Sequence, residues 1–185
     1  MTDGGGIGVL VSGAGSNLQA LSDAGIPVVA VASNVAGVPA LARAASVGAP
    51  TAVFALDVYP DRDSRDAAMA DWLAAHDVEL VVCAGYMHLL RPAFLSHFPG
   101  RVVNVHPALL PAFPGANAVE DALAAGAAET GATVHLVDEG VDTGLVLAQE
   151  VVAVLPDDTA ETLHARIRVV EHRLLPEVVK GLLAA

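Results

Sequence analysis

The segment Ile7-Gly8-Val9-Leu10-Val11-Ser12-Gly13-Ala14-Gly15-Ser16-Asn17 joins an apolar run to a glycine-rich turn. The apolar run predicts a buried strand, and a helix is expected from Asn17 to about Ala24. Further along the chain, short β-rich apolar runs again alternate with longer stretches of helical character. This alternation predicts an α/β fold, a single domain with a mostly parallel, twisted sheet of about seven strands and helices on both faces.

The same pattern predicts where the remaining elements begin and end. Strands are expected at 7–12, 27–33, 51–54, 79–83, 101–105, 132–137 and 146–154. Helices are expected at 17–24, 39–47, 64–75, 92–97 and 118–125, with a last helix ending at Leu183. Ser64 is the expected N-cap of the third helix, and Asp157-Asp158-Thr159 is expected to open the last one. Residues 1–6 are predicted to be disordered.

Composition narrows the classes of protein to consider. The chain is 54% hydrophobic and 16% charged, which is typical of a compact domain. Its net charge is −12, with 21 acidic and nine basic residues, so a nucleic-acid partner is not expected. The single cysteine, Cys83, indicates a reducing compartment and a buried thiol. No membrane span or leader sequence is visible, which predicts a cytoplasmic protein without a membrane partner.

Asn104-Val105-His106-Pro107 follows one expected strand, and Asp142 lies in a turn-rich segment after another. Asn104 and His106 are two residues apart, so on an extended strand both side chains point the same way. An amide and an imidazole on one face suit a developing oxyanion, and a carboxylate can hold the imidazole protonated or in one tautomer. The alternative is a capped strand end with a solvated acid in a loop.

The glycine-rich turn is a candidate anion site. Backbone amides of such a turn and the N-terminus of the following helix favour a phosphate. Residue 18 is Leu18, so the dinucleotide fingerprint is incomplete, and the Gly-Lys-Ser/Thr of a Walker loop is missing. A single phosphate is therefore expected here, and a purely structural tight turn is the alternative.

Taken together, these blocks resemble the glycinamide ribonucleotide formyltransferases. The resemblance extends from Val9 to about Leu175. Its landmarks are the glycine-rich turn, Ala84-Gly85-Tyr86-Met87, Asn104-Val105-His106-Pro107-Ala108-Leu109-Leu110-Pro111, Gly131-Ala132-Thr133-Val134-His135, Asp142-Thr143-Gly144 and Glu171-His172. It implies formyl transfer from the co-substrate 10-formyltetrahydrofolate to the amine of glycinamide ribonucleotide in de novo purine synthesis. No His/Cys/Asp spacing in the sequence suggests a metal site.

The resemblance also implies roles for individual residues. His106 would be a general acid, Asn104 a second oxyanion donor, and Asp142 the acid that keeps His106 protonated. The nucleotide would contact Gly15, Ser16, Asn17, Arg168 and Glu171. The folate would contact Arg65, Met87, His88, Leu89, Leu90, Asn104, Val137, Asp138, Glu139, Gly140, Val141 and Asp142. Without the resemblance, Arg65 is an exposed helix arginine, and Arg168 and Glu171 form a surface ion pair.

The chain departs from the family pattern at several positions. His88 stands where arginine is common, although contacts made by its backbone would survive. Asn117 and Val119 occupy a loop where some members carry histidines, and Leu145 replaces a usual proline, which predicts a less rigid loop. His135 is either a supporting group of the site or a structural core histidine.

Several alternatives remain open from the sequence. A formyltetrahydrofolate deformylase has a similar core, and formyl transfer to another amine is a second possibility. A folate-binding paralogue without activity is the third. The expected division of labour places phosphate binding in the N-terminal half and folate binding with catalysis in the C-terminal half of residues 1–185. The protein is expected to be a monomer or a homodimer.

Overall fold

This computed structural model describes residues 5–185. The strands are β1 (Gly6–Val11), β2 (Val28–Ser33), β3 (Thr51–Val53), β4 (Val78–Cys83), β5 (Val102–His106), β6 (Glu129–Leu136) and β7 (Val146–Ala153). The α-helices are α1 (Ser16–Asp23), α2 (Pro39–Ser46), α3 (Arg62–Ala74), α4 (Pro92–Leu95), α5 (Ala118–Ala124) and α6 (Ala160–Leu183), and a short 3₁₀ helix, η1, covers Leu56–Val58.

The strands are hydrogen-bonded in the order β3-β2-β1-β4-β5-β6-β7. The pairing is parallel for β1 with β2, β1 with β4 and β2 with β3, and antiparallel for β6 with β7. The α/β class and the mostly parallel seven-stranded sheet are therefore confirmed. By its internal contacts the chain divides into two compact units, Met1–Val103 and Asn104–Ala185.

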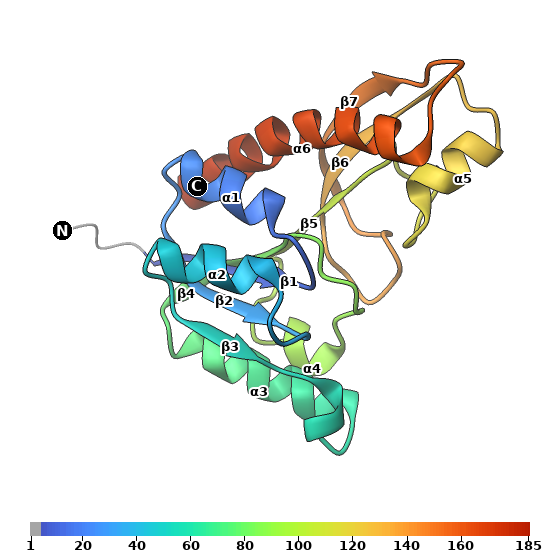
Figure 1. Cartoon of the computed structure of the whole chain (residues 1–185). Coiled ribbons are helices and arrows are strands. Elements are labelled where there is room, and N and C mark those ends of the chain that lie inside the picture. The colour runs from blue at the N-terminus through green and yellow to red at the C-terminus, as the bar shows by residue number, and fades with distance from the viewer. Residues whose placement is uncertain (1–4) are drawn as a thin grey trace. The chain divides into compact units, whose positions relative to one another are not determined.

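In the first unit the central strand is β1, and all six of its residues are buried. In Figure 1, α1 and α2 lie on one face of these strands and α3 with α4 on the other. Cover on both faces explains why β1 and β4 are almost continuously apolar. In the sheet, β2 and β3 lie on one side of β1, and β4, which follows them in the sequence, lies on the other side. In open α/β sheets, ligands bind at the carboxyl ends of strands where the order reverses in this way.

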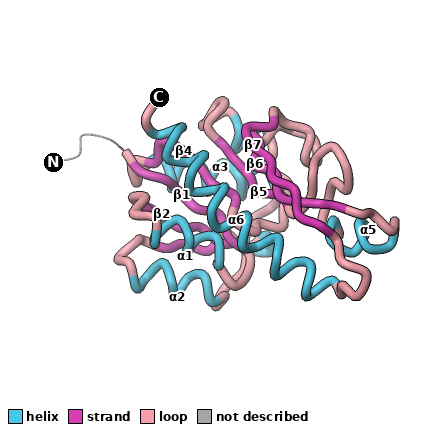
Figure 2. Tube along the Cα trace, turned by 90° about the horizontal axis from the view of Figure 1, so that it is seen from above, coloured by secondary structure: helices cyan, strands magenta, loops and turns pink. Residues whose placement is uncertain are grey.

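In the second unit the long helix α6 packs on β6 and β7, and Figure 2 shows it beside these two strands. Leu163, Ile167 and Leu175 are fully buried, and their spacing of four and eight residues places them on one helix face. Thr159 begins the helix with a reciprocal capping interaction to Thr162, as the sequence predicts.

Three sequence predictions about order and boundaries are corrected. Asp61, not Ser64, is the N-cap of α3, because its carboxylate Oδ1 accepts a hydrogen bond from the Ser64 N–H at 2.7 Å. The fourth helix ends at Leu95. Disorder over residues 1–6 is wrong for Gly5, which donates from its backbone to Glu79, and for Gly6, which starts β1; residues 1–4 lie outside the described part.

The prediction that the single thiol is buried is confirmed, because Cys83 at the end of β4 is buried and unpaired. Burial raises its pKa to about 12, so it is an unreactive core residue at neutral pH. Among the described residues, no helix has the length and apolar character that crossing a membrane requires.

Candidate active site

Three polar side chains predicted from the sequence lie together in the second unit, at the end of β5 and in the loop after β6. Nδ1 of His106 lies 3.3 Å from Oδ2 of Asp142. His135, on β6, joins them, since its Nε2 is 3.5 Å from Oδ1 of Asp142 and 3.2 Å from the amide nitrogen of Asn104. The His135 ring is therefore a supporting group of the site, because it contacts both the amide and the carboxylate.

Asp142 is held in place by its backbone as well as by its neighbours. Its φ of 53° is in the left-handed region, which aspartate adopts more readily than most residues. The Gly115 N–H donates to Oδ2 at 2.8 Å. Burial opposes its ionisation, but the contacts with His135 and Gly115 and the charge of His106 outweigh burial and lower the pKa of this carboxyl group. Asp142 is therefore a carboxylate at neutral pH.

Both ring nitrogens of His106 face hydrogen-bond acceptors. Its Nε2 lies 2.7 Å from the carbonyl oxygen of Phe113, and its Nδ1 faces the Asp142 carboxylate. Both neighbours can only accept hydrogen bonds, so a hydrogen on each ring nitrogen satisfies both. The side chain is almost fully buried. An imidazole beside a carboxylate can donate from Nε2 to a developing oxyanion when the oxyanion replaces the Phe113 carbonyl as acceptor, and it can then release that proton to a leaving group.

Asn104 completes the set of donors. An amide NH₂ group carries two hydrogens, so the nitrogen can contact His135 and still donate to a second acceptor. Because Asn104 and His106 alternate along β5 by two residues, they share a side of the strand, as the sequence predicts. The cluster therefore offers an amide and an imidazole on one side of β5.

Two further predicted residues lie on α6 in the second unit. Glu171 is only 4% exposed, so the surface position in the alternative reading is wrong for this residue. Nε of Arg168 is buried and has no hydrogen-bond partner among the residues that the structure describes. These residues are three apart and share a helix face. That helix face therefore carries the buried acid Glu171 and the Arg168 guanidinium, whose Nε–H can donate a further hydrogen bond.

The glycine-rich turn follows β1 in the first unit. Gly15 has a φ of 76°, and a Cβ on it would lie 2.7 Å from Cβ of Ala40 on α2. Ala40 donates from its backbone to the Gly13 carbonyl, and Arg43 donates to the Ala14 carbonyl. Within the described residues no side chain caps the start of α1. The start of a helix favours an anion, and a phosphate contact of Ser16 and Asn17 stays a prediction.

Replacing Gly15 with alanine should weaken nucleotide binding and lower stability. The left-handed backbone alone costs a non-glycine residue about 1–2 kcal/mol, and the Ala40 contact adds to it. Isothermal titration with the nucleotide and a thermal melt would measure both effects. Gly48→Ala is the matched control, because Gly48 also has a positive φ but a Cβ there meets nothing within 4 Å. Equal losses in both variants would contradict a role for the close approach.

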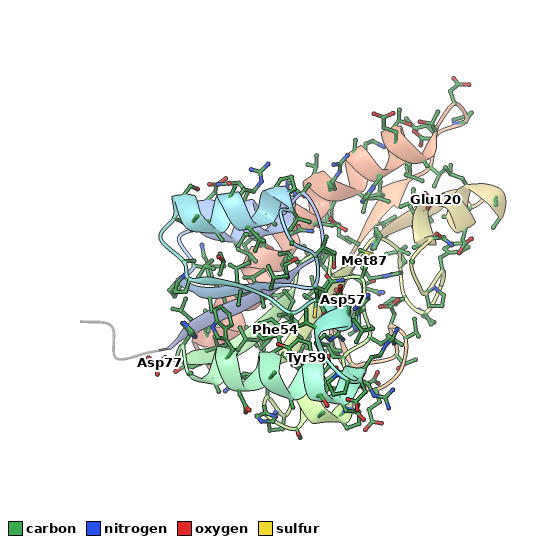
Figure 3. All side chains as sticks on the ribbon, turned by 60° about the horizontal axis from the view of Figure 1, so that its bottom comes forward. Phe54, Asp57, Tyr59, Asp77, Met87 and Glu120 are labelled. Carbon is green, nitrogen blue, oxygen red and sulfur yellow. The ribbon has the colours of Figure 1, made fainter. Side chains whose placement is uncertain are left out.

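The predicted folate segments lie in both units. Met87 and Leu89 are exposed and Leu90 is buried, and Figure 3 labels Met87. In the second unit, Val141 is exposed, and Asp138 orders its own loop by accepting hydrogen bonds from Gly140 and Thr143. In each unit these exposed apolar side chains, Met87 with Leu89 and Val141, suit contact with an apolar ligand surface. The role of these residues, with Val137 and Glu139, stays a prediction.

Arg65 differs from expectation. It is completely buried, so the alternative of an exposed helix arginine is wrong. Its guanidinium donates twice to Asp66, at 2.9 and 2.6 Å, and contacts Nδ1 of His88 at 2.6 Å. Asp66 was missed because adjacent helix positions do not normally face each other, so no spacing signals this pair. A contact of Arg65 with the folate stays a prediction.

The structure also shows where the residues that depart from the family pattern lie. Val119 is a buried residue of α5, so it contributes to packing. Asn117 is exposed at the start of α5. Leu145 is 69% exposed between β6 and β7. The reduced rigidity expected from Leu145 stays a prediction, and no group of metal-ligating side chains occurs in the described chain.

An α/β fold with an amide, an imidazole and a carboxylate grouped at strand ends is suited to group transfer at a carbonyl-type carbon. Residues 6–179 match the formyl transferase family. A phosphoribosylglycinamide formyltransferase of Mycobacterium tuberculosis is 51% identical over 178 residues, which are 94% of this chain and 83% of that protein. The chain belongs to the formyl transferase family, and it is an enzyme of the transferase class.

Solved structures of the family share the fold. The crystal structure of phosphoribosylglycinamide formyltransferase from Streptococcus pneumoniae TIGR4 has a TM-score of 0.92 at 44% identity, with 96% of this chain and 98% of that chain covered. Glycinamide ribonucleotide transformylase 1 from Symbiobacterium toebii has a TM-score of 0.95 at 43% identity, with 100% and 90% covered. The fold expected from the resemblance is therefore confirmed.

Proposed function

We propose that this protein transfers the formyl group of 10-formyltetrahydrofolate to the amine of glycinamide ribonucleotide. The products are formylglycinamide ribonucleotide and tetrahydrofolate, and the reaction belongs to de novo purine synthesis in the cytoplasm. The observation that carries the proposal is the cluster of Asn104, His106, His135 and Asp142 in a chain 51% identical to a named phosphoribosylglycinamide formyltransferase. Small molecules, and no nucleic acid or membrane, are the proposed partners.

The chemistry follows from the donors in the cluster. The substrate amine attacks the formyl carbon, and the carbonyl oxygen becomes an oxyanion. Asn104 and His106 donate hydrogen bonds to that oxyanion, which stabilises it most in the transition state. When the intermediate collapses, the bond from the formyl carbon to N10 of the folate breaks. N10 takes up a proton, and the attacking nitrogen loses one.

Asp142 has two tasks in this scheme. Its negative charge keeps His106 protonated, so that the imidazole can act as an acid. Its carboxylate also accepts the Gly115 N–H, which fixes the loop beside the histidine. Because the pKa of Asp142 is lowered, the carboxylate is charged throughout the neutral range in which the enzyme would work.

Substrate binding is assigned by residue type. Gly15, Ser16 and Asn17 would bind the phosphate through the first amides of α1. Arg168 and Glu171 would bind polar groups of the ribose or the glycinamide end, since a buried acid can accept from an amine or hydroxyl group. The folate would be bound by Met87 to Leu90 and by the loop from Val137 to Asp142, with Arg65 in contact with His88.

An absorbance assay with a 10-formyl folate, with and without glycinamide ribonucleotide, tests the proposal. Folate turnover that requires the nucleotide is the expected result. Equal turnover without the nucleotide would overturn the proposal in favour of a deformylase, in which water replaces the amine. No turnover in either case would overturn it in favour of another amine acceptor or an inactive folate-binding protein.

A further inference from the structure

A chain of polar contacts in the first unit joins the glycine-rich turn to the segment after β4. Oγ of Ser12 is 2.9 Å from the backbone nitrogen of Met87 and 2.5 Å from Oδ1 of Asn34. Nδ2 of Asn34 is 3.4 Å from Nε2 of His88, and Nδ1 of His88 is 2.6 Å from Nη1 of Arg65. All four of these contacts join residues more than 20 apart in the sequence, so the folded unit creates this arrangement.

Arg65 determines which nitrogen of His88 carries the hydrogen. A guanidinium only donates, so Nδ1 must accept. Burial and the charges of Arg65 and Arg62 lower the pKa of His88, and Asp66 opposes them, so the ring is neutral at pH 7. A neutral imidazole with a bare Nδ1 carries its hydrogen on Nε2. The ring is therefore a donor on the side that faces Asn34.

Two donors then face each other, since the neighbour of Nε2 is the Asn34 amide nitrogen. A half-turn of that amide removes the conflict, because its oxygen then faces His88 and its nitrogen faces Ser12. In the first arrangement the Ser12 hydroxyl donates to Asn34. In the turned arrangement its oxygen accepts from Asn34 and from the Met87 N–H, and its own hydrogen is left for another acceptor.

We propose that the Ser12 hydroxyl is a further donor to the phosphate of the nucleotide substrate, and that His88 directs it there by turning the Asn34 amide. Ser12 immediately precedes the turn Gly13-Ala14-Gly15, so its hydroxyl lies at the start of the anion-binding segment. A phosphate accepts strongly from hydroxyl groups and favours the turned arrangement. His88 and Asn34 are positioning residues in this account, which rests on the proposed function.

A double-mutant cycle on nucleotide affinity tests the connection. Ser12→Ala should raise the Kd for glycinamide ribonucleotide about tenfold, because one hydrogen bond to a charged group is lost. His88→Leu should raise the Kd by a smaller factor. The double variant should bind no worse than Ser12→Ala alone, since both changes remove the same hydrogen bond. Effects that multiply, or an unchanged Kd for Ser12→Ala, would overturn the inference.

His88→Gln separates the hydrogen-bonding role from simple packing. The glutamine oxygen can accept from Arg65 and its nitrogen can donate to Asn34, as the neutral imidazole does. Its Kd should therefore stay near that of the wild type, and a Kd as high as that of His88→Leu would overturn the inference. Thermal melts identify any unfolded variant. A wild-type protein that does not bind the nucleotide would overturn both the proposed function and this inference. If the wild type binds but the effects of Ser12→Ala and His88→Leu on the Kd multiply, only the inference is overturned.

Discussion

Asp142→Asn should lower the rate of formyl transfer by about two to three orders of magnitude, comparable to the loss of an oxyanion donor. An asparagine is almost the same size, so the loop after β6 should keep its shape. The charge beside Nδ1 of His106 disappears, and the imidazole is no longer held protonated. Single-turnover assays with saturating substrates would measure the loss directly, and nucleotide binding should persist.

The matched control is Asp157→Asn. Like Asp142→Asn it removes one negative charge from the second unit, but Asp157 is an exposed residue. Its kcat should stay close to that of the wild type, because Asp157 has no contact with the histidine cluster. His106→Ala should lose at least as much activity as Asp142→Asn, since it removes the acid itself. Near-native turnover in either active-site variant would show that the mechanism is wrong.

Asp66→Ala should reduce the free energy of unfolding by about 3–5 kcal/mol, which is the usual cost of removing one partner from a buried ion pair. Arg65 and Asp66 are both fully buried, so the remaining guanidinium would have neither water nor a counter-charge. The same carboxylate also accepts the backbone N–H of Arg91, and this bond would be lost too. Urea unfolding followed by circular dichroism would measure the change.

Asp63→Ala, on the same helix α3, is the control. Asp63 forms an ion pair with Arg91, but both side chains are about half exposed, and such pairs contribute about 0–1 kcal/mol. Replacing Arg65 with Met and Asp66 with Leu together should recover much of the stability, because no charge remains buried. A loss below about 1 kcal/mol for Asp66→Ala would contradict the assignment of Asp66 as the counter-ion.

Local patterns in the sequence were sufficient for most of the fold. The strand β1 is predicted by its apolar run and the start of α6 by Thr159, because burial and capping depend on residues close in sequence. The N-cap of α3 was misplaced by three residues, since Asp61 and Ser64 are both good capping residues and only the folded backbone selects one.

The candidate site divides in the same way. The pairing of Asn104 and His106 on one side of β5 follows from the two-residue period of a strand, so the sequence alone determined it. The role of His135 could not be predicted, because it depends on the spacing between β5, β6 and the loop that carries Asp142. Nor does any local signal place Asp142 in the left-handed region.

The sequence by itself therefore determined the alternating α/β fold, the membership of the formyl transferase family and the residue types that can stabilise an oxyanion. Only the tertiary structure decided that Arg65 is buried against Asp66 and contacts His88. It also decided that His106 lies between two acceptors. The physical reason is range: secondary structure follows from neighbours along the chain, whereas charge burial and hydrogen-bond partners depend on groups that only folding brings together.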